Sequence, residues 1–200
     1  MTTNPADAGP WLIYGARSFA LTVADLLRDA GQDVLGFFDD VGQPLDGVQP
    51  FAGSLPHVVQ SYGSRRPAVA LGIGYNDLSA RWSAWQRLRA LGWPLPAVVH
   101  PRAYVARTAQ LSEGCLVMAG AIVDRQARLG EASVLWPAAC VNHEVDIGHN
   151  CFVSPNATIC GAATIGPHSF VGAGVLVADH CAVPTGSFLK MGTRFTGRPA

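Results

Sequence analysis

A repeat of six residues runs without a gap from Val99 to Arg194 and constrains the fold of this chain more than any other feature. Each of its sixteen units opens with a branched aliphatic residue and carries a smaller residue four positions later. A short fixed period over nearly half of a chain indicates a solenoid. The aliphatic positions are Val99, Val105, Leu111, Val117, Val123, Leu129, Leu135, Val141, Ile147, Val153, Ile159, Ile165, Val171, Val177, Val183 and Leu189.

The period fits neither an α-helix nor an isolated amphipathic strand. It fits a coil of short parallel strands in which the aliphatic residue points inward and the small residue lets the chain turn a corner. Three units close one triangular turn, so residues eighteen apart, such as Val123, Val141 and Ile159, are expected to stack. The sequence therefore predicts a parallel β-helix of roughly five coils. Residues suited to positive φ at its turns are Gly114, Gly120, Gly130, Gly148, Asn150, Asn156 and Gly166.

The composition argues against a nucleic-acid-binding protein, a membrane protein and a disulfide-rich protein. The chain has 14 basic and 14 acidic residues, and this balance suggests neither nucleic acid nor a lipid surface as a partner. No run of apolar residues is long enough to span a membrane, and no leader is apparent, so we expect a soluble cytoplasmic protein. The five cysteines show no zinc-binding spacing, and an odd number argues against a disulfide framework.

The first 95 residues have a different pattern, so we expect two domains, residues 1–95 and 96–200. The order of elements is β-α-β-β-α, and this alternation indicates a small parallel sheet. The predicted strands are Trp11–Tyr14, Val34–Phe38 and Ala68–Ile73. One helix contains Val23, Leu26 and Leu27, the second covers Asp77–Leu91, and a polar loop with Pro44, Pro50 and Pro56 separates the last two strands.

Ligands of such sheets bind beyond the carboxyl ends of the strands. Gly15–Ser18, Asp39-Asp40 and Gly74–Asn76 follow the three strands and are expected to lie there together. One interpretation is that helix amides and Arg17 hold an anion while Asp39 or Asp40 accepts hydrogen bonds from sugar hydroxyls. The other, which motif strength alone favours, is that the glycines only serve tight turns. The domain is too short for a full dinucleotide fold, which argues against NAD.

Several segments together resemble one family of acyltransferases. They are Tyr14-Gly15-Ala16, Gly36-Phe37-Phe38-Asp39-Asp40, Leu71–Asn76, Val141-Asn142-His143-Glu144, Ile147-Gly148, Gly161, Ile165-Gly166 and Thr196–Ala200. The chain resembles the sialic acid O-acetyltransferases and the N-acetyltransferases of nucleotide-linked amino sugars over nearly its whole length. That resemblance implies a left-handed β-helix, a Rossmann-like domain that binds a sugar nucleotide, acetyl-CoA as acyl donor, no metal, a homotrimer and a role in polysaccharide biosynthesis.

The resemblance also implies roles for individual residues. His143 corresponds to the family's catalytic base and Glu144 to the acid that raises its basicity. Asp39, Asp40 and Gly74 correspond to sugar-nucleotide contacts, joined here by Gly15, Arg17 and Ser18, and Phe152, Ala173 and Met191 correspond to acyl-CoA contacts. The chain departs from the family at Phe19, where relatives have histidine in the first loop, and at Phe152, where amino-sugar enzymes often have histidine.

The residues themselves support acetyl transfer. Histidine is suited to take a proton near neutral pH, and His143 is predicted on an outer corner with Glu144 beside it. One coil further on, the backbone N–H of Gly161 is placed to bind the oxyanion. Trp136 follows an inward leucine, so it should face outward, against a neighbouring subunit. His149, His168 and His180 are predicted to face solvent.

Three alternatives remain open. The acceptor group is one of them: an amine on a nucleotide-linked deoxyamino sugar is favoured, and a sugar hydroxyl is the alternative. A metal hydratase of the γ-carbonic-anhydrase type needs a His-x4-His pair, whereas His143 and His149 are six residues apart. A non-catalytic protein that binds sugar nucleotides would also keep this fold, and the departures at Phe19 and Phe152 are compatible with it.

Overall fold

A computed structural model describes residues 9–41, 44–46 and 48–197 of the 200-residue chain. The chain divides into two compact units, Met1–Val98 and Val99–Ala200.

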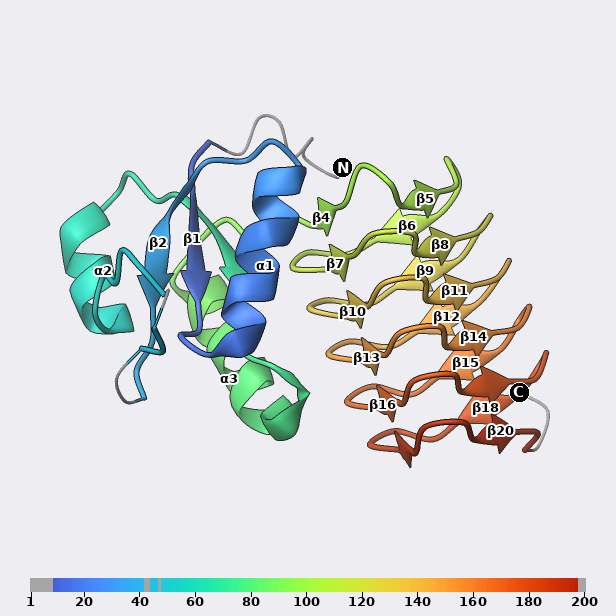
Figure 1. The fold of residues 1–200 in the computed structure, drawn as a ribbon. Helices are drawn as coiled ribbons and strands as arrows, with labels where there is room; N and C mark the ends of the chain where they lie inside the picture. Colours follow the sequence, from blue (N-terminus) through green and yellow to red (C-terminus); the bar gives the residue numbers. More distant parts are fainter. Residues whose placement is uncertain (1–8, 42–43, 47, 198–200) are drawn as a thin grey trace. The chain divides into compact units, whose positions relative to one another are not determined.

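The first unit is a small α/β unit with one three-stranded sheet (Figure 1). All of its strands are parallel, in the order β2-β1-β3, so β1 is central. The elements are β1 (Trp11–Tyr14), α1 (Ser18–Asp29), β2 (Val34–Phe38), α2 (Leu55–Tyr62), β3 (Ala68–Leu71), a 3-10 turn (Tyr75–Asp77) and α3 (Leu78–Ala90).

Helix α2 corrects the predicted order of elements. The polar loop predicted between the second and third strands contains this helix, so the observed order is β-α-β-α-β-α. Pro56 lies in its first turn, where proline is tolerated because the missing N–H has no partner within the helix. The helix is only eight residues long, too short for a clear apolar period.

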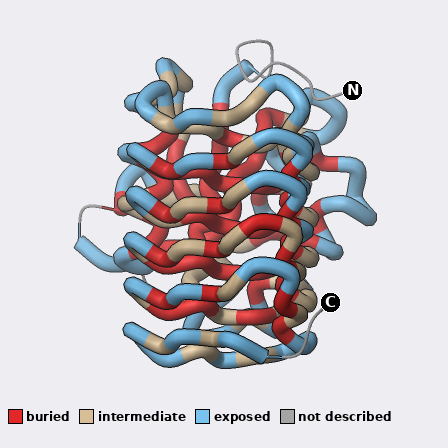
Figure 2. The backbone as a smooth tube through the Cα atoms, turned by 90° about the vertical axis from the view of Figure 1, so that its right-hand side faces the viewer, coloured by how far each residue is buried: buried red, intermediate tan, exposed pale blue. Residues whose placement is uncertain are grey.

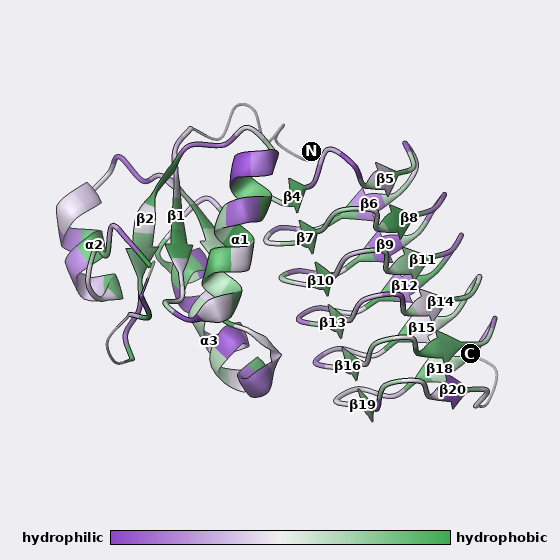
Figure 3. Cartoon of the chain, in the orientation of Figure 1, coloured by the Kyte–Doolittle hydropathy of each residue, from purple (hydrophilic) through white to green (hydrophobic). Residues whose placement is uncertain are grey.

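The core of this unit is formed by the central strand and the helix that follows it. All four residues of β1 are buried, as are Phe19, Val23 and Leu27 on α1. Figure 3 shows both hydrophobic and hydrophilic residues along α1, and the buried ones include Phe19, Val23 and Leu27, as expected for a helix with one buried face. Gly15 has φ 141°, and a Cβ there would lie 2.5 Å from the carbonyl carbon of Gly72, so the ends of β1 and β3 approach too closely for any side chain.

The second unit is a parallel β-helix of two-residue strands, and it is left-handed with about five turns. It has three sheets, ordered β19-β16-β13-β10-β7-β4, β20-β17-β14-β11-β8-β5 and β18-β15-β12-β9-β6. The strands are β4 (Val98–Val99), β5 (Tyr104–Val105), β6 (Gln110–Leu111), β7 (Leu116–Val117), β8 (Ile122–Val123), β9 (Arg128–Leu129), β10 (Val134–Leu135), β11 (Cys140–Val141), β12 (Asp146–Ile147), β13 (Phe152–Val153), β14 (Thr158–Ile159), β15 (Thr164–Ile165), β16 (Phe170–Val171), β17 (Leu176–Val177), β18 (Ala182–Val183), β19 (Phe188–Leu189) and β20 (Arg194–Phe195).

The predicted stacking of residues eighteen apart is confirmed. Val141 pairs with Val123 and Ile159, and Ile147 pairs with Leu129 and Ile165. The second residue of each strand points inward, and these side chains are fully buried through the middle coils (Figure 2). In the terminal coils Val99, Val105, Leu111 and Leu189 are only half-buried, because they have a neighbouring coil on one side alone.

The turns follow the prediction only in part. Gly114, Gly120, Asn150 and Asn156 have positive φ as predicted, and seven further non-glycine residues of the described chain, Glu144 and His168 among them, share this conformation. Gly130, Gly148 and Gly166 do not. These three glycines directly follow β9, β12 and β15, at the start of the turns on one corner. A Cβ at any of them would lie 2.3–2.7 Å from the backbone or side chain of the next coil. These three glycines are therefore required by close contact between coils rather than by backbone conformation.

The five cysteines are free thiols, and Cys115, Cys151 and Cys181 are buried at the small-residue positions of the repeat. A thiol there acts as a compact apolar group. Within the described ranges, no helix has the length and apolar character needed to cross a membrane.

Candidate functional site

His143 and Glu144 lie in the turn between β11 and β12, on an outer corner of the β-helix as predicted. Both side chains are about half exposed, and the His143 Nδ1 atom lies 3.5 Å from Glu144 Oε2. Glu144 has φ 61°, and its N–H donates to the Arg125 carbonyl of the preceding coil. With the carboxylate beside Nδ1, the Nε2 atom is the one that remains available to a substrate.

Arg125 is a member of this cluster that the sequence analysis missed. Its guanidinium NH2 lies 3.3 Å from Glu144 Oε1, so the carboxylate is held between a guanidinium and an imidazole. Arg125 precedes His143 by eighteen residues, which is one full coil. The stacking period is therefore the signal that could have identified it.

Gly161 lies directly beneath the ring of His143. A Cβ at residue 161 would be 2.5 Å from Cε1 and 2.7 Å from Nε2 of His143, so only glycine leaves room for the imidazole in this position. The N–H of Gly161 donates to no acceptor among the described residues, whereas the next N–H, that of Ala162, donates to the His143 carbonyl. A backbone donor and an imidazole thus lie side by side on one corner.

The residues predicted to contact acyl-CoA do not all lie on this corner. Ala173 and Met191 stack on the preceding corner, where the Gly192 N–H donates to the Ala173 carbonyl, and Met191 is 77% exposed. Phe152 belongs to a different sheet and is buried, with its ring 6.3 Å from Phe170 and 5.8 Å from Trp136. Within one chain, therefore, Phe152, Ala173 and Met191 lie away from His143. Gly161, the predicted oxyanion donor to acetyl-CoA, lies beside it.

One side-chain prediction on the β-helix is wrong. His149 and His168 are half-buried and contact one another, whereas His180 alone of the three is exposed to solvent as predicted. The error arises from a contact between adjacent coils, which the position within a six-residue unit does not specify. Trp136 is half-buried beside Phe152, and its packing against a neighbouring subunit stays a prediction.

The two predicted aspartates lie at the carboxyl edge of the sheet in the first unit, and both accept hydrogen bonds from backbone N–H groups of that unit. Asp39 accepts from the Ala16 N–H at 2.9 Å through Oδ2 and from the Val41 N–H at 2.9 Å through Oδ1. It thereby joins the loop after β1 to the loop after β2.

Asp40 is the centre of a hydrogen-bonded cluster with Tyr14 and Arg87. The Tyr14 hydroxyl donates to Asp40 Oδ2 at 2.6 Å, the Arg87 guanidinium lies 2.8 Å from the same oxygen, and the Leu55 N–H donates to Oδ1 at 2.8 Å. Burial disfavours the ionised form of Asp40, but the bonds from Tyr14, Leu55 and Arg87 outweigh it and lower the pKa of Asp40. Burial and the same bond to Asp40 raise the pKa of Tyr14. Sequence reasoning missed Tyr14 and Arg87, and no sequence spacing links them.

The remaining predicted contacts of the first unit lie on the same edge. Arg17 and Ser18 are exposed at the start of α1, and Arg17 makes no side-chain capping bond. Gly74 follows β3 and lies against Phe19, whose side chain is 3.6 Å from where a Cβ of residue 74 would be. Phe19 thus occupies this edge of the sheet.

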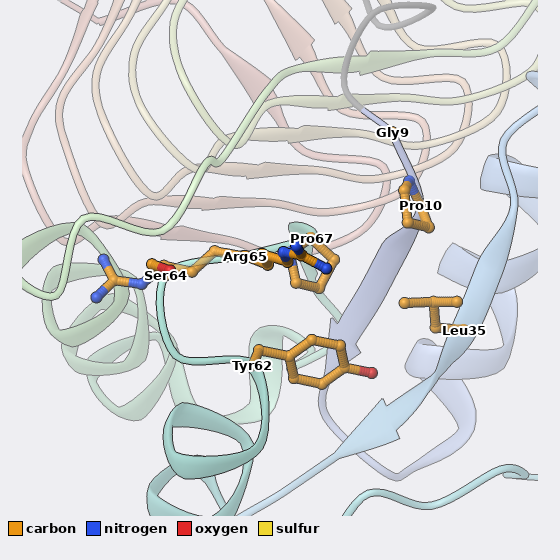
Figure 4. A pocket seen from close by; sticks show the side chains of 8 residues that line it. Gly9, Pro10, Leu35, Tyr62, Ser64, Arg65 and Pro67 are labelled. Carbon is orange, nitrogen blue, oxygen red and sulfur yellow. The ribbon is translucent and has the colours of Figure 1, made fainter.

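A hollow of about 480 Å³ lies at the opposite, amino-terminal end of these strands (Figure 4). Its lining residues are Gly9, Pro10, Leu35, Tyr62, Ser64, Arg65, Arg66 and Pro67. None of the predicted nucleotide contacts lines it, so it offers no support for their role.

The site contains neither an activated cysteine nor a group of metal ligands of the hydratase kind. Burial raises the pKa of the Cys140 and Cys160 thiols, which disfavours the nucleophilic thiolate. In the described part of the chain, no three His, Cys, Asp or Glu side chains gather closely enough to hold a metal ion.

Comparison with known families matches residues 144–179 to the bacterial transferase hexapeptide model, which spans six repeats. The matched segment begins within the His143–Glu144 turn and includes Gly161. A search of curated protein sequences gave no significant match.

Several solved structures share the fold over nearly the whole chain. The acetyltransferase domain of PglB from Neisseria gonorrhoeae, solved with acetyl coenzyme A, is 26% identical, with a TM-score of 0.84 over 92% of this chain and 88% of that one. PerB from Caulobacter crescentus, solved with CoA and GDP-perosamine, is 28% identical, with a TM-score of 0.72 over 90% and 93%. WeeI from Acinetobacter baumannii, 21% identical over 90% and 95% with a TM-score of 0.53, shares the fold alone.

We expect the Asp40→Asn variant to lose a stabilisation that depends on pH. Because the folded chain lowers the pKa of Asp40, its carboxylate stabilises the fold fully above the unfolded pKa of about 3.9, and this contribution disappears as pH falls through the lower folded pKa. The variant should be about 1–3 kcal/mol less stable at pH 7. Its difference from the wild type should shrink as urea unfolding is repeated from pH 6 down to pH 3. Asp25→Asn removes an exposed carboxylate and is the control, expected to change the stability at pH 7 much less than Asp40→Asn does.

The Gly161→Ala variant tests the packing of His143. The new methyl group would overlap the imidazole, so we expect the half-exposed ring to rotate into another rotamer while the free energy of unfolding changes by about 1 kcal/mol or less. A crystal structure of the variant measures the ring position directly. An imidazole still lying over residue 161 would contradict the contact described here.

Proposed function

We propose that this chain, a member of the hexapeptide-repeat acyltransferases, transfers an acetyl group from acetyl-CoA to the amino group of a nucleotide-linked amino sugar. Its family, predicted from the sequence, is confirmed by the repeat match and by the solved neighbours, which include amino-sugar N-acetyltransferases. One observation carries the proposed chemistry, namely the imidazole of His143 held over Gly161 with the Glu144 carboxylate at its Nδ1 atom.

The acyl donor follows from the neighbours that share the repeat. PglB was solved with acetyl coenzyme A, and PerB with CoA and GDP-perosamine. A thioester needs no metal for transfer to an amine, only alignment, removal of a proton and stabilisation of the developing oxyanion. The corner with His143 and Gly161 offers the last two.

In the proposed reaction the sugar amine attacks the thioester carbonyl directly, without an acyl-enzyme. The new C–N bond forms as the carbonyl oxygen takes up negative charge, and the amine proton passes to Nε2 of His143. The tetrahedral intermediate then expels the CoA sulfur, which takes the proton from the imidazolium and leaves as a thiol. Glu144, 3.5 Å from Nδ1, stabilises the imidazolium between these steps.

Gly161 has two roles in this scheme. Its missing side chain lets the imidazole lie flat over the corner, and its N–H, which no described residue accepts, is available to the oxyanion. A fixed backbone donor of this kind stabilises the transition state without having to reorient during the reaction.

Arg125 influences His143, the proposed base, through Glu144. By pairing with Glu144 at 3.3 Å it fixes the carboxylate, and it also offsets part of the negative charge that His143 faces. Both partners are about half exposed, so solvent screens the pair and its contribution to stability is small. Its effect is expected on catalysis rather than on folding.

The first unit is proposed to bind the nucleotide of the acceptor. Gly15, Arg17, Ser18, Asp39, Asp40 and Gly74 all lie along the carboxyl edge of its sheet, where such folds bind ligands. Arg17 and Ser18 are exposed there, at the N-terminus of the twelve-residue helix α1, and a phosphate suits that position. Since Asp40 already binds Tyr14, Arg87 and Leu55, we propose that it acts by holding the edge together.

A homotrimer would bring the separated acyl-CoA residues to the site. Ala173 and Met191 lie one corner away from His143 on the same chain, with the outer face of the β11 sheet between the two corners. On that face Tyr104, Ile122 and Leu176 are 59%, 41% and 39% exposed, and Tyr104 and Ile122 pair directly on adjacent strands, so apolar side chains gather on this face as they do at interaction surfaces. We propose that this face packs against a second copy, with Phe152, Ala173 and Met191 lining the acyl-CoA side.

Thiol release from acetyl-CoA tests the reaction, with UDP-, dTDP- and GDP-linked amino sugars as acceptors. We expect release with one of them and a loss of at least about 100-fold in the His143→Ala variant, the usual contribution of a general base. Glu144→Gln and Arg125→Gln should show smaller losses with altered pH profiles. His180→Ala removes an exposed histidine from the same corner and is the matched control, expected to keep full activity.

Other outcomes separate the alternatives. Undiminished release by His143→Ala would exclude His143 as the base even if the reaction is right. Release only with sialic acids or other sugar hydroxyls as acceptors would make the chain an O-acetyltransferase. Binding of a sugar nucleotide without any acyl transfer would favour the non-catalytic interpretation.

The proposed trimer predicts a mass of three times the 21.0 kDa chain by light scattering after gel filtration. Ile122→Arg places a charge on the apolar face and should reduce the mass to that of one chain, while Arg128→Ala, an exposed position on another sheet, should leave the trimer intact. A wild-type monomer would contradict the proposed assembly.

A further inference from the structure

Two histidines meet on a corner of the β-helix that takes no part in the proposed reaction. His149 lies in the turn between β12 and β13, and His168 lies one coil further on, between β15 and β16. Their Nε2 atoms are 3.1 Å apart, and the rings are perpendicular, with an interplanar angle of 89° and centroids 4.7 Å apart. His143 belongs to the preceding corner, so this pair is separate from the catalytic residues.

The backbone and a buried amide hold the two rings in place. The His168 N–H donates to the His149 carbonyl at 3.0 Å, which stacks the two turns. Asn150, fully buried, has its side-chain amide nitrogen 2.9 Å from Nδ1 of His168. Both imidazoles are half-buried, so little freedom would be lost when they bind a common ligand.

The geometry is that of two ligands converging on one ion. Zn²⁺ binds imidazole nitrogen at about 2.0–2.1 Å, so two nitrogens at an angle of roughly 90–110° on one ion lie about 2.8–3.4 Å apart. The observed 3.1 Å falls within this range. A straight N–H···N bond would place the ring centroids more than about 5 Å apart. At 4.7 Å the ring axes must be inclined to the line between the nitrogens.

The chemistry of the pair favours borderline metals. Both Nε2 atoms belong to imidazole rings, which bind metal ions through a ring nitrogen that carries no proton. In the neutral pair one Nε2 carries a proton, and metal binding moves it to Nδ1 of the same ring. If that ring is His168, the Asn150 amide turns over, so that its oxygen rather than its nitrogen faces the Nδ1 proton and accepts from it, as supporting groups around metal sites commonly do. Imidazole ligands suit Zn²⁺, Ni²⁺ and Cu²⁺ rather than Mg²⁺ or Ca²⁺.

We propose that His149 and His168 form a binding site for a divalent transition-metal ion, which links two neighbouring coils of the β-helix. The protein supplies two imidazoles, and water completes the coordination. Such a site binds reversibly and stabilises the folded coil through its binding energy, because the unfolded chain does not hold the two histidines together. This inference is independent of acetyl transfer.

Isothermal titration of the untagged, EDTA-treated full chain with ZnSO₄ and with NiCl₂ at pH 7.5 tests the site. We expect one ion per chain with micromolar affinity, weakened at least tenfold in both His149→Gln and His168→Gln. The same ions should raise the melting temperature of the wild type and not that of either variant. His180→Gln and His143→Gln are the controls and should bind as the wild type does, since neither residue belongs to the pair.

The absence of binding to the wild type, or binding that survives in both His149→Gln and His168→Gln, would overturn the proposal. Loss through misfolding is recognised separately, because circular dichroism without metal should show both variants folded. Imidazole NMR signals give a second readout. Those assigned to His149 and His168 by the variants should shift with Zn²⁺, and a shift confined to His143 or His180 would overturn the proposal as well. None of these measurements requires CoA or a sugar, so their outcome does not depend on the proposed function.

Discussion

The hydrogen bonds between successive coils are the interaction on which the rest of this structure depends. Each coil repeats the path of the one before it eighteen residues earlier, as in the bonds from the Asp146 N–H to the Ala163 carbonyl and from the Gly148 N–H to the Ile165 carbonyl. Buried aliphatic columns stabilise this stacking from inside. Because every turn is held by its neighbours, turn residues of different coils keep fixed positions. That constraint places an imidazole, a carboxylate, a guanidinium and a bare backbone N–H on one corner.

The β-helix could be predicted because every six-residue unit repeats the same pattern, and because each aliphatic side chain is buried only if it points into the coil. Details set by contacts between coils could not. Gly130 looked like a turn glycine, yet it is required because a Cβ would meet the backbone of the next coil. Helix α2 was missed because eight residues with Pro56 in the first turn give no clear helical period. In both cases the deciding interaction lies outside the local sequence.

The same distinction applies to the site. His143 and Glu144 were predicted from their order and from resemblance, and the structure adds Arg125, which the eighteen-residue period could have revealed. The cluster of Asp40 with Arg87 joins residues far apart in sequence, and no pattern indicated it. The rigid repeat also explains how His143, the proposed base, keeps a fixed position although it is half exposed. Its position comes from the backbone of three coils rather than from a surrounding core.

The most direct test of the central claim is a crystal structure of the chain with CoA and an amino-sugar nucleotide. We predict that the CoA sulfur lies beside Gly161, so that the carbonyl oxygen of an acetyl group on that sulfur would reach the Gly161 N–H, and that the sugar nitrogen lies about 3 Å from Nε2 of His143. A sulfur bound at another corner, or an amine with no contact to His143, would contradict it.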